Sequence, residues 1–273
     1  MPVRPCSASS PHDRARVMES LAELLGLSQA ALLAGFTVFL RVGAAMAMLP
    51  AFGEQGVPAR IRLGAAIAFT AIVAPMVAVP PAASLTEIAL SLTLLSETAI
   101  GLAFGFGLRL FVYVLQIAGS MAAQSTSLAQ IFGASPDVDP QPAIGHLLVV
   151  SGLALAALSG LHLQVALAFV ASYDVLPVGA VIGAAEAMDW GVARISAAFG
   201  LAFSLASPFI IAALIYNIAL GVINRAMPQL MVAFVGAPAI TAGGLILLFF
   251  ATPWLLALWR DALQAYLALP FGG

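Results

Sequence analysis

The sequence predicts an all-α integral membrane protein, and three observations lead to this fold class. Of the 273 residues, 62% are hydrophobic and only 8% are charged, whereas a soluble domain carries about 25% charged residues. The mean hydropathy is +1.08. Apolar windows recur along the chain, and each reaches the roughly 20 residues that a helix needs to cross a hydrocarbon core. The windows lack the alternating pattern of a strand, so we expect helices throughout.

Six apolar helical segments are predicted, over residues 27–50, 61–80, 88–118, 144–170, 195–223 and 231–258. Prolines punctuate most of them, at Pro50, Pro75, Pro208, Pro238 and Pro253. A proline inside an apolar helix either kinks it, with the freed carbonyls bonded to neighbouring helices, or divides it into broken or hairpin helices that must be packed in protein. The frequency of the prolines favours broken or hairpin helices.

Polar residues precede the expected membrane domain and interrupt it once. Residues 1–17 are expected to be a disordered tail, and residues 18–273 a single membrane domain. The helix-like pattern begins with MESLAELLGL, so we hypothesise that translation starts at Met18. Arginines are nearly balanced between the two sides of the predicted spans, so the positive-inside rule gives no orientation. The longest polar interruption, 125–142, mixes apolar residues with prolines.

Ionisable residues inside the apolar windows are candidates for function, because charge at membrane depth is costly and usually faces protein or water. Arg41 is expected to donate hydrogen bonds between helices, and a place on a translocation path is the alternative. Glu97 precedes Gly101 and Gly105, a small-xxx-small pattern that allows close helix contact. Glu97 is therefore expected to bond to a neighbouring helix or subunit, with proton coupling as the alternative.

Several classes of function are disfavoured by what the sequence lacks. All ten basic residues are arginine, so a phosphate-binding loop, a Schiff-base lysine and a Ser-x-x-Lys nucleophile are impossible. GxSxG, HExxH and paired-carboxylate patterns are also missing, and we expect a non-enzymatic protein with no cofactor or metal. Scattered arginines and a net charge of -2 argue against nucleic acid as a partner. A proton-coupled small-solute transporter that uses Glu97 and Asp174 is the alternative function.

Three segments, read together, resemble one protein family. They are LRVGAAMAMLPAFGEQGVPARIRLGAAIAF (40–69), ETAIGLAFGFGLRLFVYVLQIAGSMAAQSTSLAQIF (97–132) and YNIALGVINRAMPQLMVAFVGAPA (216–239). The third contains an Asn-Arg-x-x-Pro-Gln-Leu turn at 224–230, which is the most specific part of the resemblance. The chain resembles the FliR family of flagellar type III export-gate proteins, whose virulence counterparts are called SctT.

The resemblance implies a large assembly rather than an isolated six-span bundle. Members of the family form a helical export gate with FliP-like and FliQ-like subunits, and FlhB-like and FlhA-like proteins join it. Unfolded flagellar proteins are the implied substrates, and the implied location is the bacterial inner (cell) membrane at the flagellar basal body, in contact with lipid. An export-gate subunit of SctT-type virulence secretion is a second alternative.

The resemblance also implies roles for individual residues. The segment matching 125–142 is expected to project into the channel as a plug, with Leu128, Ile131, Phe132 and Pro136 as plug residues. The sequence departs from the family pattern after Phe132. At the 224–230 turn, polar side chains are expected to cap helix ends of a partner, and an ordinary interfacial turn is the alternative. The expected interface or structural residues are Arg41, Arg60, Arg62, Glu97, Gly101, Gly105, Gln116, Asn217, Asn224, Arg225, Pro228 and Gln229.

Overall fold

The computed structural model describes residues 11–50, 57–79, 87–126, 143–226 and 232–272, and within these ranges the chain is helical and contains no strand. The elements are α1 (Pro11–Met48), α2 (Ala59–Val73), the 3-10 helix η1 (Ala74–Met76), α3 (Glu87–Ser125), α4 (Ala143–Leu158), α5 (Leu161–Val175), α6 (Ala184–Ala226) and α7 (Val232–Ala268). Five of the described helices are long and apolar enough to cross a membrane, and α4 with α5 form a bent sixth candidate. The predicted fold class is confirmed.

The first helix begins earlier than the polar composition of residues 1–17 suggests. Instead of a disordered tail through residue 17, the structure shows helix from Pro11 onwards. Proline suits the first position of a helix, because its missing N–H would have no partner there and its φ is already helical. The alanine and arginine residues that follow are good helix formers. Residues 1–10 lie outside the described part of the chain.

The bend in the fourth predicted segment falls at a glycine. The axes of α4 and α5 differ in direction by 74°, and Gly160 between them has a φ of 77°, a left-handed conformation that favours glycine. Pro208, Pro238 and Pro253 instead lie inside helices that continue through them. At these three positions the proline therefore does not divide the helix into broken or hairpin helices.

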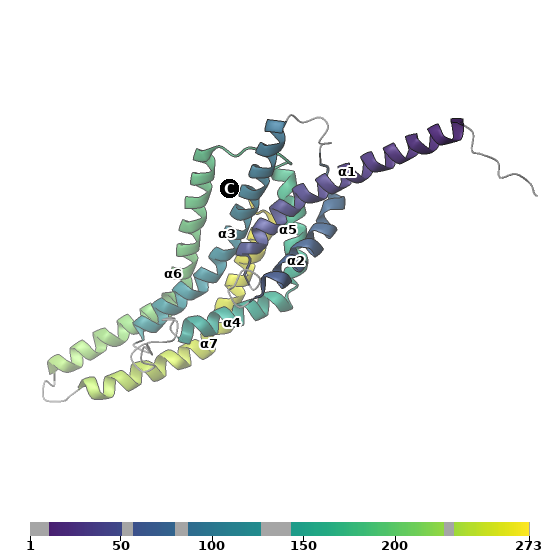
Figure 1. Ribbon diagram of the computed structural model, residues 1–273. Helices are drawn as coiled ribbons and strands as arrows, with labels where there is room; N and C mark the ends of the chain where they lie inside the picture. The colour runs from purple at the N-terminus through teal and green to yellow at the C-terminus, as the bar shows by residue number, and fades with distance from the viewer. Residues whose placement is uncertain (1–10, 51–56, 80–86, 127–142, 227–231, 273) are drawn as a thin grey trace, which may run out of the picture.

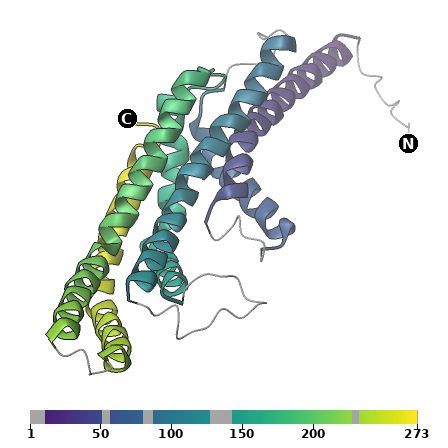
Figure 2. The same ribbon diagram turned by 90° about the vertical axis from the view of Figure 1, so that its left-hand side faces the viewer.

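The long helix α3 lies at the centre of the molecule. It has its most extensive contacts with α1 and α6, and it also contacts α4 and α7. Figures 1 and 2 show an elongated body in which α6 and α7 form an antiparallel hairpin. The tip of this hairpin lies at the opposite end of the molecule from the start of α1 (Figure 1). The hairpin therefore extends well beyond the helices that pack around the middle of α3.

Aromatic side chains fill the core where α3, α5 and α7 meet. The ring centroid of Phe104 lies 4.7 Å from that of Phe169 and 6.3 Å from that of Tyr266. Trp259 is 1% exposed, and its Nε1 donates to the carbonyl oxygen of Phe111 at 2.8 Å. Paired aromatic rings contribute about 0.5–1.5 kcal/mol beyond their burial. This core holds α5 and α7 against α3, next to the polar cluster described below.

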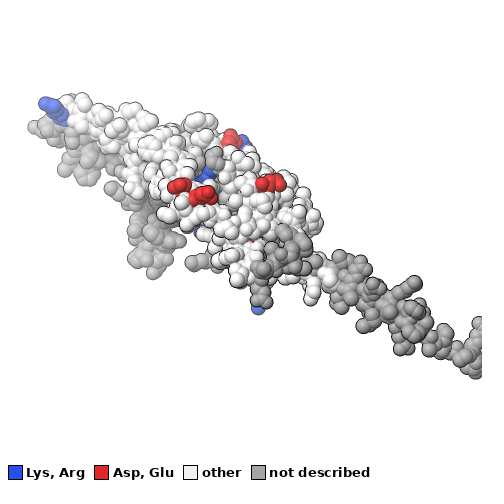
Figure 3. Space-filling model, turned by 90° about the horizontal axis from the view of Figure 1, so that it is seen from above, with Lys and Arg blue, Asp and Glu red and all other residues white. Residues whose placement is uncertain are grey.

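The outer surface is strongly apolar. Figure 3 shows a face with few charged side chains, which occur in small, separate groups. Large hydrophobic residues point outward on α6 and α7, including Phe199, Phe249 and Trp254. Of the candidate spans in α6 and α7, only 28% is buried within the chain. Exposed apolar area on this scale must be covered by lipid or by other proteins.

Candidate functional site

Arg41 of α1 and Glu97 of α3 form a buried ion pair. The Arg41 Nε donates to Glu97 Oε2 at 2.7 Å, and Nη2 donates to Oε1 at 3.0 Å. Both side chains are 0% exposed. This two-point contact uses the planar match between guanidinium and carboxylate, which a lysine could not reproduce. The pair joins helices whose bonded residues are 56 positions apart in the sequence.

Three groups at the end of α5 also contact the arginine. Nη1 of Arg41 donates to Ser172 Oγ at 3.1 Å, and Nη2 donates to the Leu176 carbonyl at 2.9 Å. The guanidinium carbon lies 3.6 Å from the ring centroid of Tyr173, a distance typical of a cation–π contact. A buried charge is tolerated only when its hydrogen-bonding groups are satisfied in this way.

Glu97 has two further donors besides the arginine. The Tyr173 hydroxyl donates to Oε2 at 3.3 Å, and the backbone N–H of Gly179 donates to Oε1 at 3.1 Å. Gly179 has a φ of 79°, so the turn after α5 needs glycine there to direct its N–H at the carboxylate. We call Arg41, Glu97, Ser172, Tyr173, Leu176 and Gly179 the Arg41–Glu97 cluster.

Gly101 and Gly105 let α1 approach the same face of α3. A Cβ atom at Gly101 would lie 2.2 Å from the Arg41 carbonyl oxygen, and one at Gly105 would lie 2.6 Å from that of Ala45. Residues four apart lie on one helix face, so both glycines continue the face that carries Glu97. The small-xxx-small pattern is thus used for helix contact within the chain, at the level of the Arg41–Glu97 cluster.

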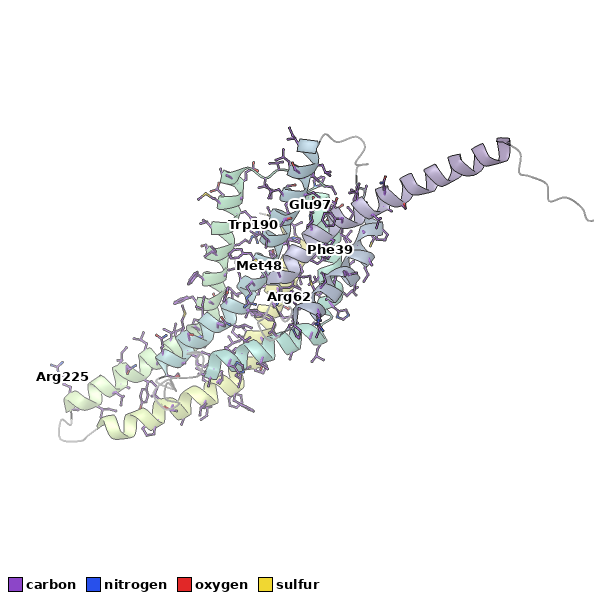
Figure 4. The ribbon with its side chains drawn as sticks, in the orientation of Figure 1. Phe39, Met48, Arg62, Glu97, Trp190 and Arg225 are labelled. Atoms are coloured by element: carbon purple, nitrogen blue, oxygen red, sulfur yellow. The ribbon has the colours of Figure 1, made fainter. Side chains whose placement is uncertain are left out.

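The other described candidates lie apart from this cluster. Arg60 is exposed and Arg62 is half-buried near the start of α2. Asn217 is exposed on α6, where its Nδ2 donates to the Ala213 carbonyl at 2.8 Å. Figure 4 shows Arg225 at the far tip of α6, away from Glu97. The negative end of the helix dipole favours a cation at such a position.

Gln116 is half-buried on α3, beside the close contact of that helix with α4. Asn224 belongs to the last turn of α6, but its side chain is outside the described part. Pro228 and Gln229 also lie outside the described residues. The same is true of the expected plug residues, which are Leu128, Ile131, Phe132 and Pro136.

The two carboxylates of the transporter hypothesis are not brought together. Glu97 is 0% exposed and ion-paired, whereas Asp174 is exposed at the end of α5. A carboxylate that couples proton movement must exchange with water, and Glu97 is enclosed by Arg41 and two other donors. The geometry therefore does not favour this alternative.

Ser172, Tyr173 and Gly179 were not singled out from the sequence. A weak signal was present, because Pro177 and Gly179 directly follow a helical pattern and are typical turn residues. Neither residue indicates that the turn folds back onto α3. Glu97 and Gly179 are 82 residues apart in the sequence, so no local sequence pattern can predict their contact.

With the geometry described, comparison with known proteins identifies the family. The chain matches the family described as "Bacterial export proteins, family 1" over residues 32–266. It is 34% identical to the flagellar biosynthetic protein FliR of Caulobacter vibrioides, over 82% of this chain and 90% of that protein. The chain belongs to the FliR family of bacterial export proteins.

Other FliR proteins are similar over a comparable length. The FliR of Bacillus subtilis is 27% identical over 77% of this chain and 83% of that protein. The FliR of Escherichia coli is 27% identical over 80% of this chain and 84% of that protein. The whole Arg41–Glu97 cluster lies inside the range that matches the FliR family, and the predicted family resemblance is confirmed.

Proposed function

We propose that this chain is a non-enzymatic channel subunit of the flagellar type III protein export gate. In this proposal it forms, with FliP-like and FliQ-like subunits, the passage for unfolded flagellar proteins. FlhB-like and FlhA-like proteins join the assembly at the flagellar basal body, in the bacterial inner membrane. Membership of the FliR family supports this function, and the length of the apolar helices is the structural observation that carries it.

The apolar part of α6 is too long for a single membrane crossing. Its charge-free stretch covers 195–223, which is 29 residues, or about 43 Å at 1.5 Å per residue. The hydrocarbon core is about 30 Å thick, so a tilt of about 45° would be needed, beyond the upper limit of about 40°. The excess apolar length must be covered by protein. This supports a subunit stacked against partner helices.

Deletion of the gene in its host tests the proposed function. We expect the deletion strain to lose export of hook and filament proteins, and the full chain supplied in trans to restore it. An affinity-tagged chain should copurify FliP-like and FliQ-like subunits. A deletion strain that still assembles flagella would contradict the proposal. If the deletion strain kept its flagella but lost secretion of virulence proteins, the SctT-type alternative would replace the flagellar proposal.

Two finer assignments belong to the same proposal. Closure of the resting passage by Leu128, Ile131, Phe132 and Pro136 is supported by the resemblance alone. Contact with partner subunits is proposed for Arg60, Asn217 and Arg225, three polar side chains that the structure leaves exposed. Polar groups on so apolar a surface are typical of sites that face protein or water.

A further inference from the structure

A cavity of about 460 Å³ lies between α3, α6 and the end of α7. Sites for small molecules measure roughly 300–1,000 Å³, so the hollow is large enough for a ligand. Its lining comes from about two turns of each helix, over 107–114 of α3, 194–201 of α6 and 262–269 at the end of α7 and just beyond it. Stretches of this length make the cavity about 10 Å long, parallel to the helices.

Small side chains make this space. The cavity is lined by Gly107 of α3, by Ala197 and Ala198 of α6, and by Ala262 and Ala265 of α7. Protein interiors are close-packed, and an unfilled hollow loses the dispersion contacts of its lining. The hollow is open on one side, and its mostly apolar wall offers few hydrogen-bond partners to water. The walls therefore fit a flexible apolar chain.

Arg194 supplies the charge at one end of the cavity. One terminal nitrogen of its guanidinium donates to the Gly272 carbonyl. Its Nε is buried and has no hydrogen-bond partner. Tyr266, which also lines the cavity, already donates its hydroxyl proton to the Phe104 carbonyl at 3.2 Å. Among the described residues no carboxylate forms an ion pair with Arg194, and a guanidinium without a counter-charge favours an anionic acceptor.

The surroundings of Arg194 are those of a membrane interface. The exposed acids Glu186 and Asp189 lie within about two turns of it along α6. Trp190 lies one turn away, and tryptophan is enriched where a bilayer meets water. From this level the cavity extends along α6 to Leu201. An anion at Arg194 would therefore sit at headgroup depth, with the apolar space leading toward the hydrocarbon.

We propose that this cavity binds an anionic phospholipid, with an acyl chain between the three helices and the headgroup phosphate paired with the Arg194 guanidinium, which lines the cavity. Guanidinium groups match phosphate oxygens well. Exposed Ala197 and Leu269 contribute to the lining, so a chain can enter sideways from the bilayer. The inference depends on the cavity and its arginine, and it stands independently of the export function.

Native mass spectrometry of the full chain, purified with its copurifying subunits, tests the proposal. The wild-type protein should retain phosphatidylglycerol through delipidation, in preference to zwitterionic phosphatidylethanolamine. Arg194→Gln should lower the affinity for phosphatidylglycerol about tenfold, the factor expected for loss of a charge-assisted hydrogen bond. Arg194→Lys should keep most of the affinity for phosphatidylglycerol, because it keeps the positive charge. Ala262→Leu should fill the cavity and lower occupancy by both lipids.

Arg109→Gln is the matched control. Arg109 is a half-buried arginine on α3 that lies over Tyr113 and outside the cavity lining, so its loss should leave lipid occupancy unchanged. Equal retention of phosphatidylglycerol by the wild type, Arg194→Gln and Ala262→Leu would overturn the proposal. Displacement of the lipid by inorganic phosphate alone would also overturn it, because the site would then be a phosphate site. A wild-type complex that carries no phosphatidylglycerol would show that protein fills the cavity.

Discussion

Arg41 and Glu97 are both fully buried, so removal of one leaves the other without its counter-charge. Glu97→Gln should lower the free energy of unfolding by about 3–5 kcal/mol, the usual cost of breaking a buried pair from one side. Denaturant unfolding of the purified chain in detergent measures this change.

The double variant Arg41→Met with Glu97→Met is the control for that experiment. It removes both charges at similar volume, and it should recover most of the lost stability because buried pairs replaced by apolar residues are often neutral. Arg109→Met, outside the Arg41–Glu97 cluster, should change little. Wild-type stability of Glu97→Gln would contradict a structural role of the pair.

Gly101 tests the close approach of α1 and α3. Gly101→Ala places a methyl group against the Arg41 backbone, and the helices must shift to accept it. We expect a loss of about 1–3 kcal/mol, the range for overpacking, measured by the same unfolding assay. Gly64→Ala is the matched control, because a Cβ there meets nothing within 4 Å. Similar stabilities of the two variants would argue against the contact.

At this scale the sequence showed which residues matter but could not show their partners. Arg41 and Glu97 stand out because charge is rare in the apolar windows, and the glycines stand out by their spacing. Their pairing depends on helices brought together by the fold. Ser172 and Tyr173 escaped notice, since a serine and a tyrosine near a helix end have many ordinary roles.

At the scale of helices, Gly160 controls the direction of the chain between α4 and α5. Gly160→Ala should destabilise the protein by about 1–2 kcal/mol, because a left-handed conformation is strained for a residue with a Cβ. Gly200→Ala, inside α6 with open space around it, should instead be neutral or stabilising by about 0.5–1 kcal/mol. Thermal unfolding compares the two, and equal effects would contradict this role of Gly160.

Each of the six apolar windows predicted from the sequence overlaps helix over most of its described length, and the fourth window is divided between α4 and α5. Hydropathy finds them because a bilayer requires long runs of apolar residues. The position of the bend was not predictable in the same way. A proline is conspicuous in a sequence but can be accommodated in a packed helix, whereas the left-handed glycine that turns the chain resembles any other glycine of a membrane helix.

At the scale of the whole molecule, the exposed apolar surface and the isolated polar tip of α6 point to partner subunits. Arg225→Ala should reduce copurification of FliP-like and FliQ-like subunits several-fold, because the tip would lose a donor for helix ends of a partner. Arg260→Ala is a suitable control, since that arginine already pairs with Asp261. Unchanged copurification by Arg225→Ala would count against an interface at the tip.

The proposed plug gives a prediction about the intact assembly. Replacement of Ile131 and Phe132 by glycine should leave the complex assembled but let ions leak through the resting membrane, because the apolar side chains that seal the passage would be lost. Conductance of the inner membrane measures the leak. A complex that stops exporting without any rise in conductance would contradict the plug role.

The Arg41–Glu97 cluster also has a consequence for biogenesis. Glu97 follows Arg41 by 56 residues and Ser172 follows it by 131, so at about 5–20 residues per second the arginine leaves the ribosome several seconds before its carboxylate. During that interval α1 carries an unpaired arginine, and a charge in an apolar helix raises the free energy of insertion by up to about 2.5–3.5 kcal/mol. Pairing with Glu97 can offset that cost only after the third apolar helix of the chain has been made.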